Sequence, residues 1–269
     1  MPGYEYYSGG STFGGSMPKV IKTLILINIG VFLLQIASGW KVSPIFGLSS
    51  QHVFGNLMIW QLFTYMFLHG GVLHLVFNMF ILWMFGRELE EMWGEKGFLR
   101  YYLTCGIGAG IVTCLFTLGS PIITIGASGA VFGILIAYAV IYPERPITLL
   151  IFFIIPVTLK AKHLVTILIG MEFLFCIAGT ADGIGHFAHI GGAVIGYVYL
   201  KIWKRSSSYD YGYKESFFSR LGEALEKWKQ KNANVSEEEV DRILDKISKN
   251  GIKSLSWRER LTLRKRAKK

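Results

Sequence analysis

The sequence has few charged residues and few cysteines, and it lacks the patterns that usually accompany either. Charged side chains make up 17% of the 269 residues, and they are missing from several long stretches. The three cysteines, Cys105, Cys114 and Cys176, lie in these apolar stretches, without a CxxC pair or other metal-ligand spacing. We therefore expect neither a disulfide framework nor a metal site, and we interpret the cysteines as small apolar side chains.

The N-terminus lacks the features of a targeting segment. Residues 1–17 are rich in Gly, Ser and Tyr and carry one charged side chain, Glu5. A secretory signal has a basic start and an apolar core, and a mitochondrial transit peptide carries arginines. We therefore expect residues 1–17 to be a flexible N-terminus and the first apolar block to remain in the mature protein as a membrane span.

Apolar residues make up 52% of the chain and occur in long uncharged blocks. Such blocks are typical of a protein that crosses a membrane several times. Most are near or below the ~20 residues that cross a ~30 Å hydrocarbon core. The predicted fold class is an all-α membrane protein, a bundle of six transmembrane helices. The six predicted spans are about 20–38, 72–92, 97–118, 128–142, 163–177 and 188–203.

Two segments between these blocks need a separate interpretation. The fourth span begins at Ser128, directly after the glycine-containing segment 119–127. A short span can begin partway through the bilayer if the preceding loop is buried in protein, so we expect 119–127 to be re-entrant. Residues 147–157 are apolar but too few to cross, and we interpret them as an interfacial segment.

Basic residues indicate the orientation in the membrane. Lys and Arg accumulate at one end of the predicted spans, whereas the opposite side carries only Lys41. The positive-inside rule then places both termini in the cytoplasm and the loops 39–71, 119–127 and 178–187 outside. We expect an integral protein of the plasma (inner) membrane that contacts membrane lipids, and no nucleic-acid partner.

The tail, residues 205–269, has the pattern of a separate basic unit. Ser236 followed by Glu239 is a capping-box signature, and Asn250-Gly251 is a helix stop. Ser256 and Glu259 repeat the cap, and a polar helix is predicted over 217–231. These signals predict a small helical cytoplasmic tail. The spacing alone also fits a DNA-binding helix-turn-helix, but a cytoplasmic appendage is the favoured interpretation.

A serine and a histidine stand inside two of the apolar blocks. Ser128 lies in Gly126-Ala127-Ser128-Gly129, and His189 begins His189-Ile190-Gly191-Gly192. A serine hydroxyl needs an adjacent base to become a nucleophile, and imidazole is the usual one. Taken alone, Ser128 reads as the cap of a loop-to-helix turn. An ionisable residue within a membrane favours function instead, so we predict a nucleophile and its base without a cofactor or metal.

Small residues indicate that the fourth and sixth spans pack closely. Gly129 and Gly133 are four residues apart on one span, as Gly192 and Gly196 are on the other. Such spacing lets membrane helices approach closely, as a serine–histidine hydrogen bond requires. Gly126 permits a tight turn before the serine.

Other histidines in the chain can have either a functional or a structural role. His74 and Asn78 lie on one face of the second span and can both donate hydrogen bonds. They suit an oxyanion hole beside a Ser–His pair, whereas alone they would be a polar clasp between helices. We interpret His52 and His69 as structural and His186, on the outer-loop side of the sixth span, as interfacial.

With these motifs in order, residues 18–204 resemble the rhomboid intramembrane serine proteases. The motifs are His74-Leu-Val-Phe-Asn78, Gly126-Ala-Ser128-Gly129 and Ala188-His189-Ile-Gly-Gly192. The resemblance implies a Ser128–His189 dyad without an acidic third member. It implies an oxyanion hole formed by Asn78, His74 and the backbone N–H of Ser128.

The resemblance also implies roles for residues that would otherwise read as packing. Phe132 matches the aromatic residue that stacks on the catalytic histidine, and Glu90 matches the acidic residue at the end of the second span. The first outer loop departs from the family: Trp60-Gln61 stands where Trp-Arg is common. The tail is similar to the helical C-terminal extension of some bacterial members.

The function expected from these features is an intramembrane serine endopeptidase that acts on single-span membrane proteins. One alternative is a catalytically silent rhomboid-like protein that binds membrane spans, although such proteins lack the serine or the histidine. Another is a transporter, which would show internal repeats. Glu172 in the fifth span has no assigned role, and Asp182 is interpreted as a solvated loop charge.

Overall fold

The protein is described from a computed structural model that covers residues 16–151, 155–178, 183–206, 237–257, 259 and 263. The chain divides into two compact units, Met1–Tyr211 and Gly212–Lys269. The predicted polar helix over 217–231 and Asp182 lie outside the described residues.

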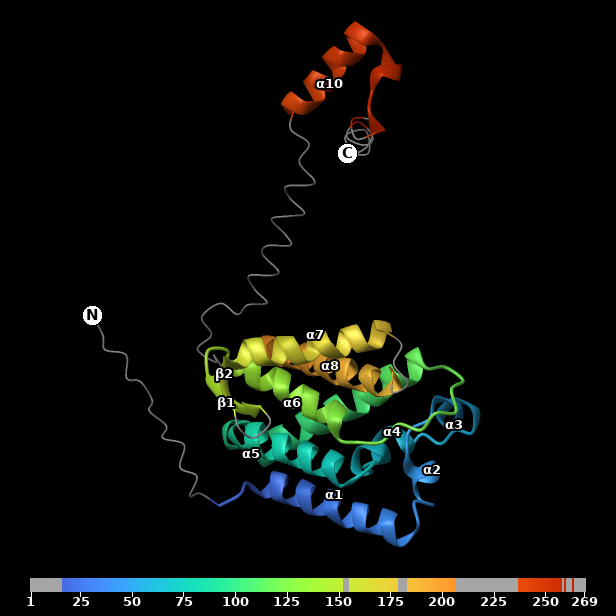
Figure 1. The fold of residues 1–269 in the computed structure, drawn as a ribbon, viewed down its shortest axis with the longest axis vertical. Helices are drawn as coiled ribbons and strands as arrows, with labels where there is room; N and C mark the ends of the chain where they lie inside the picture. The colour runs from blue at the N-terminus through green and yellow to red at the C-terminus, as the bar shows by residue number, and fades with distance from the viewer. Residues whose placement is uncertain are drawn as a thin grey trace, which may run out of the picture. The chain divides into compact units, whose positions relative to one another are not determined.

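The first unit is built mainly from helices. Helices α5, α6 and α8 pack on one another at its centre, α1 packs on α5, and α7 packs on α6 and α8. Figure 1 shows α1 and α7 on opposite sides of α6. The long helices are α1 (Lys19–Ala37), α5 (Val72–Phe116), α6 (Ser128–Ile141), α7 (Ala161–Ala178) and α8 (Gly183–Ser206).

Helix α5 contains the predicted second and third spans as two helical pieces. They join at Gly94, whose φ of 71° and ψ of 168° are not helical. A side chain is strained in that conformation, so glycine allows the sharp bend. Among the described residues, α1, α5 and α7 are long and apolar enough to cross a membrane, and α6 is a shorter apolar helix of 14 residues.

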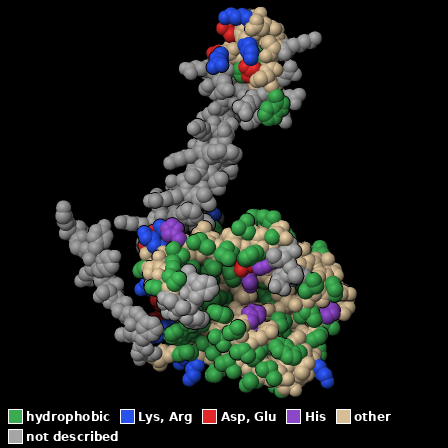
Figure 2. Space-filling view, viewed as in Figure 1, with side chains coloured by type: hydrophobic (Ala, Val, Ile, Leu, Met, Phe, Trp, Pro, Cys, Tyr) green, Lys and Arg blue, Asp and Glu red, His purple; other side chains and the backbone are tan. Residues whose placement is uncertain are grey.

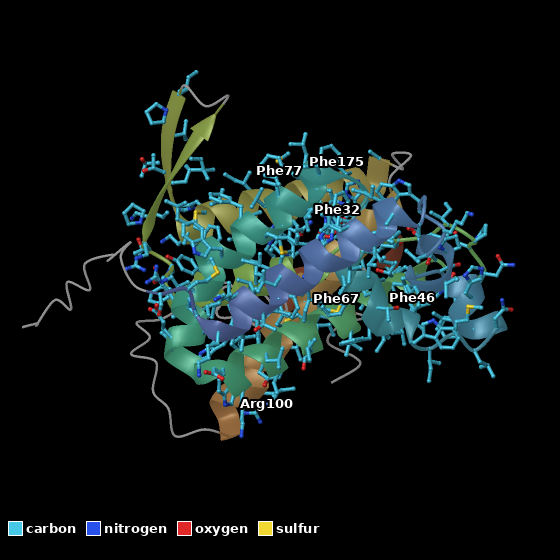
Figure 3. The ribbon with its side chains drawn as sticks, turned by 90° about the horizontal axis from the view of Figure 1, so that it is seen from below. Phe32, Phe46, Phe67, Phe77, Arg100 and Phe175 are labelled. Atoms are coloured by element: carbon cyan, nitrogen blue, oxygen red, sulfur yellow. The ribbon has the colours of Figure 1, made fainter. Side chains whose placement is uncertain are left out.

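The outer surface of the helices is apolar. Leu33 is 60% exposed, Phe77 57% and Leu174 65%, from three different helices. Figure 3 shows Phe77 and Phe175 at the outside of the helices, and Figure 2 shows hydrophobic side chains over much of this unit. Continuous exposed apolar surface of this kind is unfavourable in water and is expected where lipid covers it. The chain is therefore a membrane protein.

The segment predicted as interfacial forms a β-hairpin, so the prediction of an all-α fold is incomplete. Strand β1 (Pro146–Ile151) pairs antiparallel with β2 (Ile155–Lys160). The hydroxyls of Thr148 and Thr158 face each other across the pair at 2.9 Å. The segment is rich in Ile, Val, Thr and Phe, which favour a pleated strand, and Pro156 does not fit a helix interior.

Four short helices occupy the segment between α1 and α5. Buried Gln61 anchors this segment: its Oε1 accepts the N–H of Ser49 at 3.1 Å, and its Nε2 donates to the carbonyls of Pro44 and Ile45 at 3.2 Å. Gln61 thus ties the start of this segment to its middle. The helices are α2 (Ser43–Phe46), α3 (Ser50–Gly55), α4 (Gln61–Thr64) and the 3₁₀ helix η1 (Tyr65–Phe67).

Glu90, buried at the end of the first piece of α5, caps α1. Its two carboxylate oxygens accept the backbone N–H groups of Val20 and Ile21, each at 2.9 Å. Pro18, at the N-cap position of α1, makes no side-chain cap of its own. The carboxylate therefore satisfies orphan donors and complements the positive end of the helix dipole.

Glycines allow α6 and α8 to approach to backbone contact, as their spacing predicts. A Cβ atom on Gly192 would overlap the carbonyl of Gly129, and one on Gly196 would lie 3.0 Å from Cα of Gly133. Gly129 in turn faces the carbonyl of Ala188. The two helices that carry the predicted serine and histidine are therefore held together at the closest distance that backbones permit.

We expect Gly192→Ala to destabilise the protein by about 1–3 kcal/mol, because the new methyl group collides with rigid backbone rather than with a movable side chain. Thermal unfolding in detergent measures this. The matched control is Gly170→Ala on α7, where an added Cβ meets nothing within 4 Å. Equal melting temperatures for the two variants would contradict the close packing of α6 on α8.

The second unit contains α10 (Glu237–Asn250) and η2 (Ile252–Ser254). The predicted stop is confirmed, because Gly251 takes a φ of 75° and its N–H donates to the carbonyl of Ile247. The second predicted cap is present: Ser256 N–H donates to Glu259 at 2.7 Å, and Glu259 N–H donates to Ser256 Oγ at 3.3 Å. Hydrogen bonds from Lys246 and then Ser256 lower the pKa of Glu259 to about 2.

Candidate active site

The extended segment before α6 places Ser128 at the start of that helix. Leu48 and Thr124 form an antiparallel bridge, and the N–H of Gly126 donates to the carbonyl of Tyr65 at 2.9 Å. Gly126 has a φ of 135°, a conformation that side chains rarely adopt. Ser128 then opens the helix, where backbone N–H groups have no partner within the helix.

His189 on α8 contacts Ser128 directly. Its Nε2 lies 2.8 Å from the serine Oγ, a normal hydrogen-bond distance. The imidazole also stacks on Phe132, one turn into α6, with ring centroids 4.5 Å apart and an interplanar angle of 10°. The serine, the histidine and the aromatic residue named from the sequence are thus brought together by the glycine contact between α6 and α8.

His74 lies beside the serine across Gly126. An atom at the Cβ position of Gly126 would be 2.9 Å from Nε2 of His74 and 3.6 Å from Oγ of Ser128. Nδ1 of His74 accepts the N–H of Gly70 at 3.3 Å, which makes Nε2 the protonated nitrogen and a possible donor.

Asn78, one turn further along α5, is buried and donates from its amide to the carbonyl of His74 at 2.9 Å. An amide nitrogen has two N–H donors, so this bond uses one of them. The ring of His69, also buried, lies edge-on to His74 at a centroid distance of 5.1 Å.

The sequence analysis assigned no role to Glu172, and the structure turns it toward His189. Its Oε2 lies 2.9 Å from Nδ1 of His189 and 2.5 Å from Nδ1 of His186. Figure 2 shows histidine side chains gathered with an acidic side chain beside a hollow in this face. The available sequence signal was the presence of a carboxylate in an apolar span, which by default marks a functional site.

The structure also corrects the position of His186. Helix α8 begins at Gly183 rather than near residue 188, so His186 lies within the helix, one turn before His189. Its ring packs on Phe175 of α7, with centroids 5.4 Å apart, rather than facing the outer surface alone. Residues three apart share a helix face, which brings both imidazoles to Glu172.

The three groups around Glu172 also have the chemistry of metal ligands. The donor atoms of Glu172, His186 and His189 lie within 4.8 Å of one another, the only such group among the described residues. One of the three is His189, which also contacts Ser128. A metal ion held here would bind the ring nitrogen that faces Glu172, Nδ1. The hydrogen bond between Ser128 and His189 involves the other ring nitrogen, Nε2.

Comparison with known protein families gives two matches. Residues 56–206 match the family model described as the Rhomboid domain. The matched part of the chain contains His74, Asn78, Ser128 and His189. Residues 226–269 match a family of unknown function, DUF6576. The tail therefore has relatives of its own, but its match carries no activity.

Individual relatives are similar over about two thirds of the chain or slightly more. Rhomboid protease GluP of Bacillus subtilis (strain 168) is 31% identical over 192 residues, which is 70% of this chain and 35% of the relative. Rhomboid-like protein 11, chloroplastic, of Arabidopsis thaliana is 32% identical over 72% of this chain and 69% of the relative. Rhomboid protease AarA of Providencia stuartii is 34% identical over 65% and 68%. The chain thus spans about a third of the first relative and about two thirds of the others.

Proposed function

The chain belongs to the rhomboid family, and we propose that it is a serine endopeptidase that cleaves single-span proteins within the membrane. The observation that carries the proposal is the 2.8 Å contact between Ser128 Oγ and His189 Nε2. A hydroxyl and an imidazole in contact at the start of an apolar helix suit acyl transfer. Two of the similar proteins are named as rhomboid proteases, which supports the same activity.

The proposed reaction begins with Ser128. Its Oγ attacks the carbonyl carbon of the scissile peptide bond while Nε2 of His189 takes the hydroxyl proton. The carbonyl electrons move to oxygen, which gives a tetrahedral intermediate. When the C=O bond re-forms, the C–N bond breaks, the imidazolium gives its proton to the departing amine, and an acyl-enzyme remains. Water, activated by the same imidazole, hydrolyses the acyl-enzyme. Phe132, stacked on the ring, holds the imidazole in the plane from which it reaches Ser128.

The oxyanion formed in this reaction needs hydrogen-bond donors. The proposed donors are the backbone N–H at the start of α6, Nε2–H of His74 and the amide of Asn78. Their support is the position of His74 against Gly126 and the tautomer required by Gly70. A helix N-terminus adds a partial positive charge at the same place.

The proposal includes the arrangement in the membrane. Residues 18–204 would form a six-span protease domain, 1–17 a flexible N-terminus and 205–269 a basic helical tail in the cytoplasm. Substrate and water would reach the site from the outer side, between α7 and α8. The apolar outer faces of the helices and the three long apolar helices support an integral membrane position.

The test is cleavage by the purified full chain in liposomes. We expect it to cut a generic single-span substrate and to react with a fluorophosphonate probe. The alternative, a catalytically silent protein that binds membrane spans, is favoured by relatives that are named only as rhomboid-like. It predicts substrate binding without cleavage or labelling. That result, with a well-folded protein, would exclude the protease.

We expect Asn78→Ala to lower kcat by about 10–10³-fold with little change in KM, because the oxyanion exists only in the transition state. The loss is partial because the His74 ring and the backbone N–H remain. Steady-state kinetics in liposomes measure it. An effect confined to KM would show that Asn78 binds substrate rather than stabilising the oxyanion.

A further inference from the structure

Glu172 is an acidic side chain on the inward side of α7, in the apolar stretch from Ile167 to Ala178. Its neighbours Met171, Phe173 and Leu174 are exposed on the outside of α7, whereas the Glu172 carboxylate is only 16% exposed. A carboxylate held away from water is costly unless it is paired. The partners within reach are the imidazoles of His186 and His189.

We propose that Glu172 is a positioning residue that turns the Ser128–His189 pair into a Ser128–His189–Glu172 triad. The inference rests on the proposed function. His189 lies between the other two side chains: Nε2 is 2.8 Å from Ser128 Oγ, and Nδ1 is 2.9 Å from Glu172 Oε2. The sequence resemblance implies a dyad, so this chain would add a third member from α7.

The two contacts of the imidazole give the carboxylate a specific task. A carboxylate accepts only, so Nδ1 of His189 must carry the proton that faces it. Nε2 is then left unprotonated and can accept the proton of the Ser128 hydroxyl. After the transfer, the ring is an imidazolium, and the negative charge of Glu172 stabilises it. Orientation, tautomer and charge are the three contributions made by the acidic member of a serine protease triad.

The contact between His189 and Glu172 is close but not fully aligned. Nδ1 of His189 is within hydrogen-bonding distance of Oε2, although its N–H does not point along that line. Catalytic hydrogen bonds are often loose without substrate and tighten when the substrate binds. The same oxygen, Oε2, also contacts Nδ1 of His186, so both imidazoles meet the carboxylate at one atom.

His186 supplies a rival explanation for the burial of Glu172. The 2.5 Å contact between Glu172 and His186 could by itself satisfy the carboxylate, leaving no role toward His189. The two explanations differ in what changes when the carboxylate is removed. A merely structural pair affects stability alone, whereas a triad member affects the reaction rate and its pH dependence.

The main test replaces Glu172 with glutamine, which keeps size and shape but removes the charge. We expect Glu172→Gln to lower kcat and the rate of fluorophosphonate labelling by about 10²–10⁴-fold, with KM nearly unchanged. The acidic limb of the kcat/KM profile should move to lower pH, because a neutral amide no longer stabilises the imidazolium. The assay uses the full chain in liposomes and a single-span substrate.

Two further variants make the result specific. Glu172→Asp keeps the charge but shortens the side chain, so it should be intermediate in rate and fold even if the glutamine variant does not. Glu144→Gln is the matched control, because Glu144 pairs with Lys160 and Lys162 beside the hairpin. Those ammonium groups lower the pKa of Glu144 to about 2, so the same loss of a charged carboxylate occurs away from Ser128.

The outcomes separate this inference from the proposed function. If the wild-type protein neither cleaves nor labels, the protease itself is wrong and the triad falls with it. If the wild type is active but Glu172→Gln and Glu172→Asp both keep its rate and pH profile, only the triad is wrong. Loss of wild-type activity in EDTA would show that Glu172, His186 and His189 hold a metal ion, and would also overturn the triad.

Discussion

Ser128→Ala is expected to abolish both substrate cleavage and fluorophosphonate labelling while leaving a folded, membrane-inserted protein. The substitution removes one oxygen, the proposed nucleophile. No side-chain cap of α6 depends on this hydroxyl, and its described hydrogen bond is the one to His189, so little stability is lost. In a serine protease, loss of the nucleophile lowers kcat by about 10⁶-fold.

The experiment compares wild type and Ser128→Ala in the same liposomes, with melting temperature as the check on folding. The control is Ser38→Ala, at the end of α1, whose hydroxyl hydrogen-bonds only locally to the carbonyl of Gln35. It should cleave and label as the wild type does. Undiminished cleavage by Ser128→Ala would remove this serine from the mechanism, whatever the labelling shows.

The second large effect is expected from His189→Ala. Without the imidazole, the Ser128 hydroxyl keeps its proton and is a weak nucleophile, so both cleavage and labelling should fall by about 10³-fold or more. The loss of the ring also leaves Phe132 without its stacking partner. Labelling of Ser128 is the more direct measurement, because it requires activation of the serine but no substrate recognition.

His163→Ala is the matched control for this substitution. His163 lies on α7 with its side chain exposed, and its removal should not affect the reaction. A labelling rate that survives in His189→Ala would mean that another group activates Ser128. The variant that then loses labelling would identify the base, and His186, one turn away, would be examined first.

Much of the local structure was determined by the sequence alone. The ends of α1, α6 and α10 follow from apolar blocks, a glycine-flanked serine and a glycine stop, which are patterns among neighbouring residues. The spacing of glycines predicted the close contact of α6 with α8, because absent side chains set how near two backbones can come. Ser128 and His189 could be named from the sequence because their side-chain chemistry and their immediate neighbours are also local features.

Other features depended on how the elements pack. Between Ile167 and Ala178, Glu172 is the one polar residue of α7, so no polar stripe marks which side of this part of the helix faces the protein. The position of Glu172 therefore could not be read from the sequence. The anchoring by Gln61 and the cap that Glu90 gives α1 join residues far apart in the chain. The apolar composition of residues 147–157 is compatible with an irregular interfacial segment as well as with strands. The antiparallel pairing of β1 with β2 distinguishes the two.

The sequence therefore determined which residues have the chemistry for a serine–histidine reaction and which helices carry them. Only the tertiary structure decided that a carboxylate from α7 reaches the far side of the His189 ring. The physical reason is that a reactive group can be recognised by its type and its immediate neighbours. Its partners across helices are set by the rotation and depth at which those helices pack, which no local pattern records.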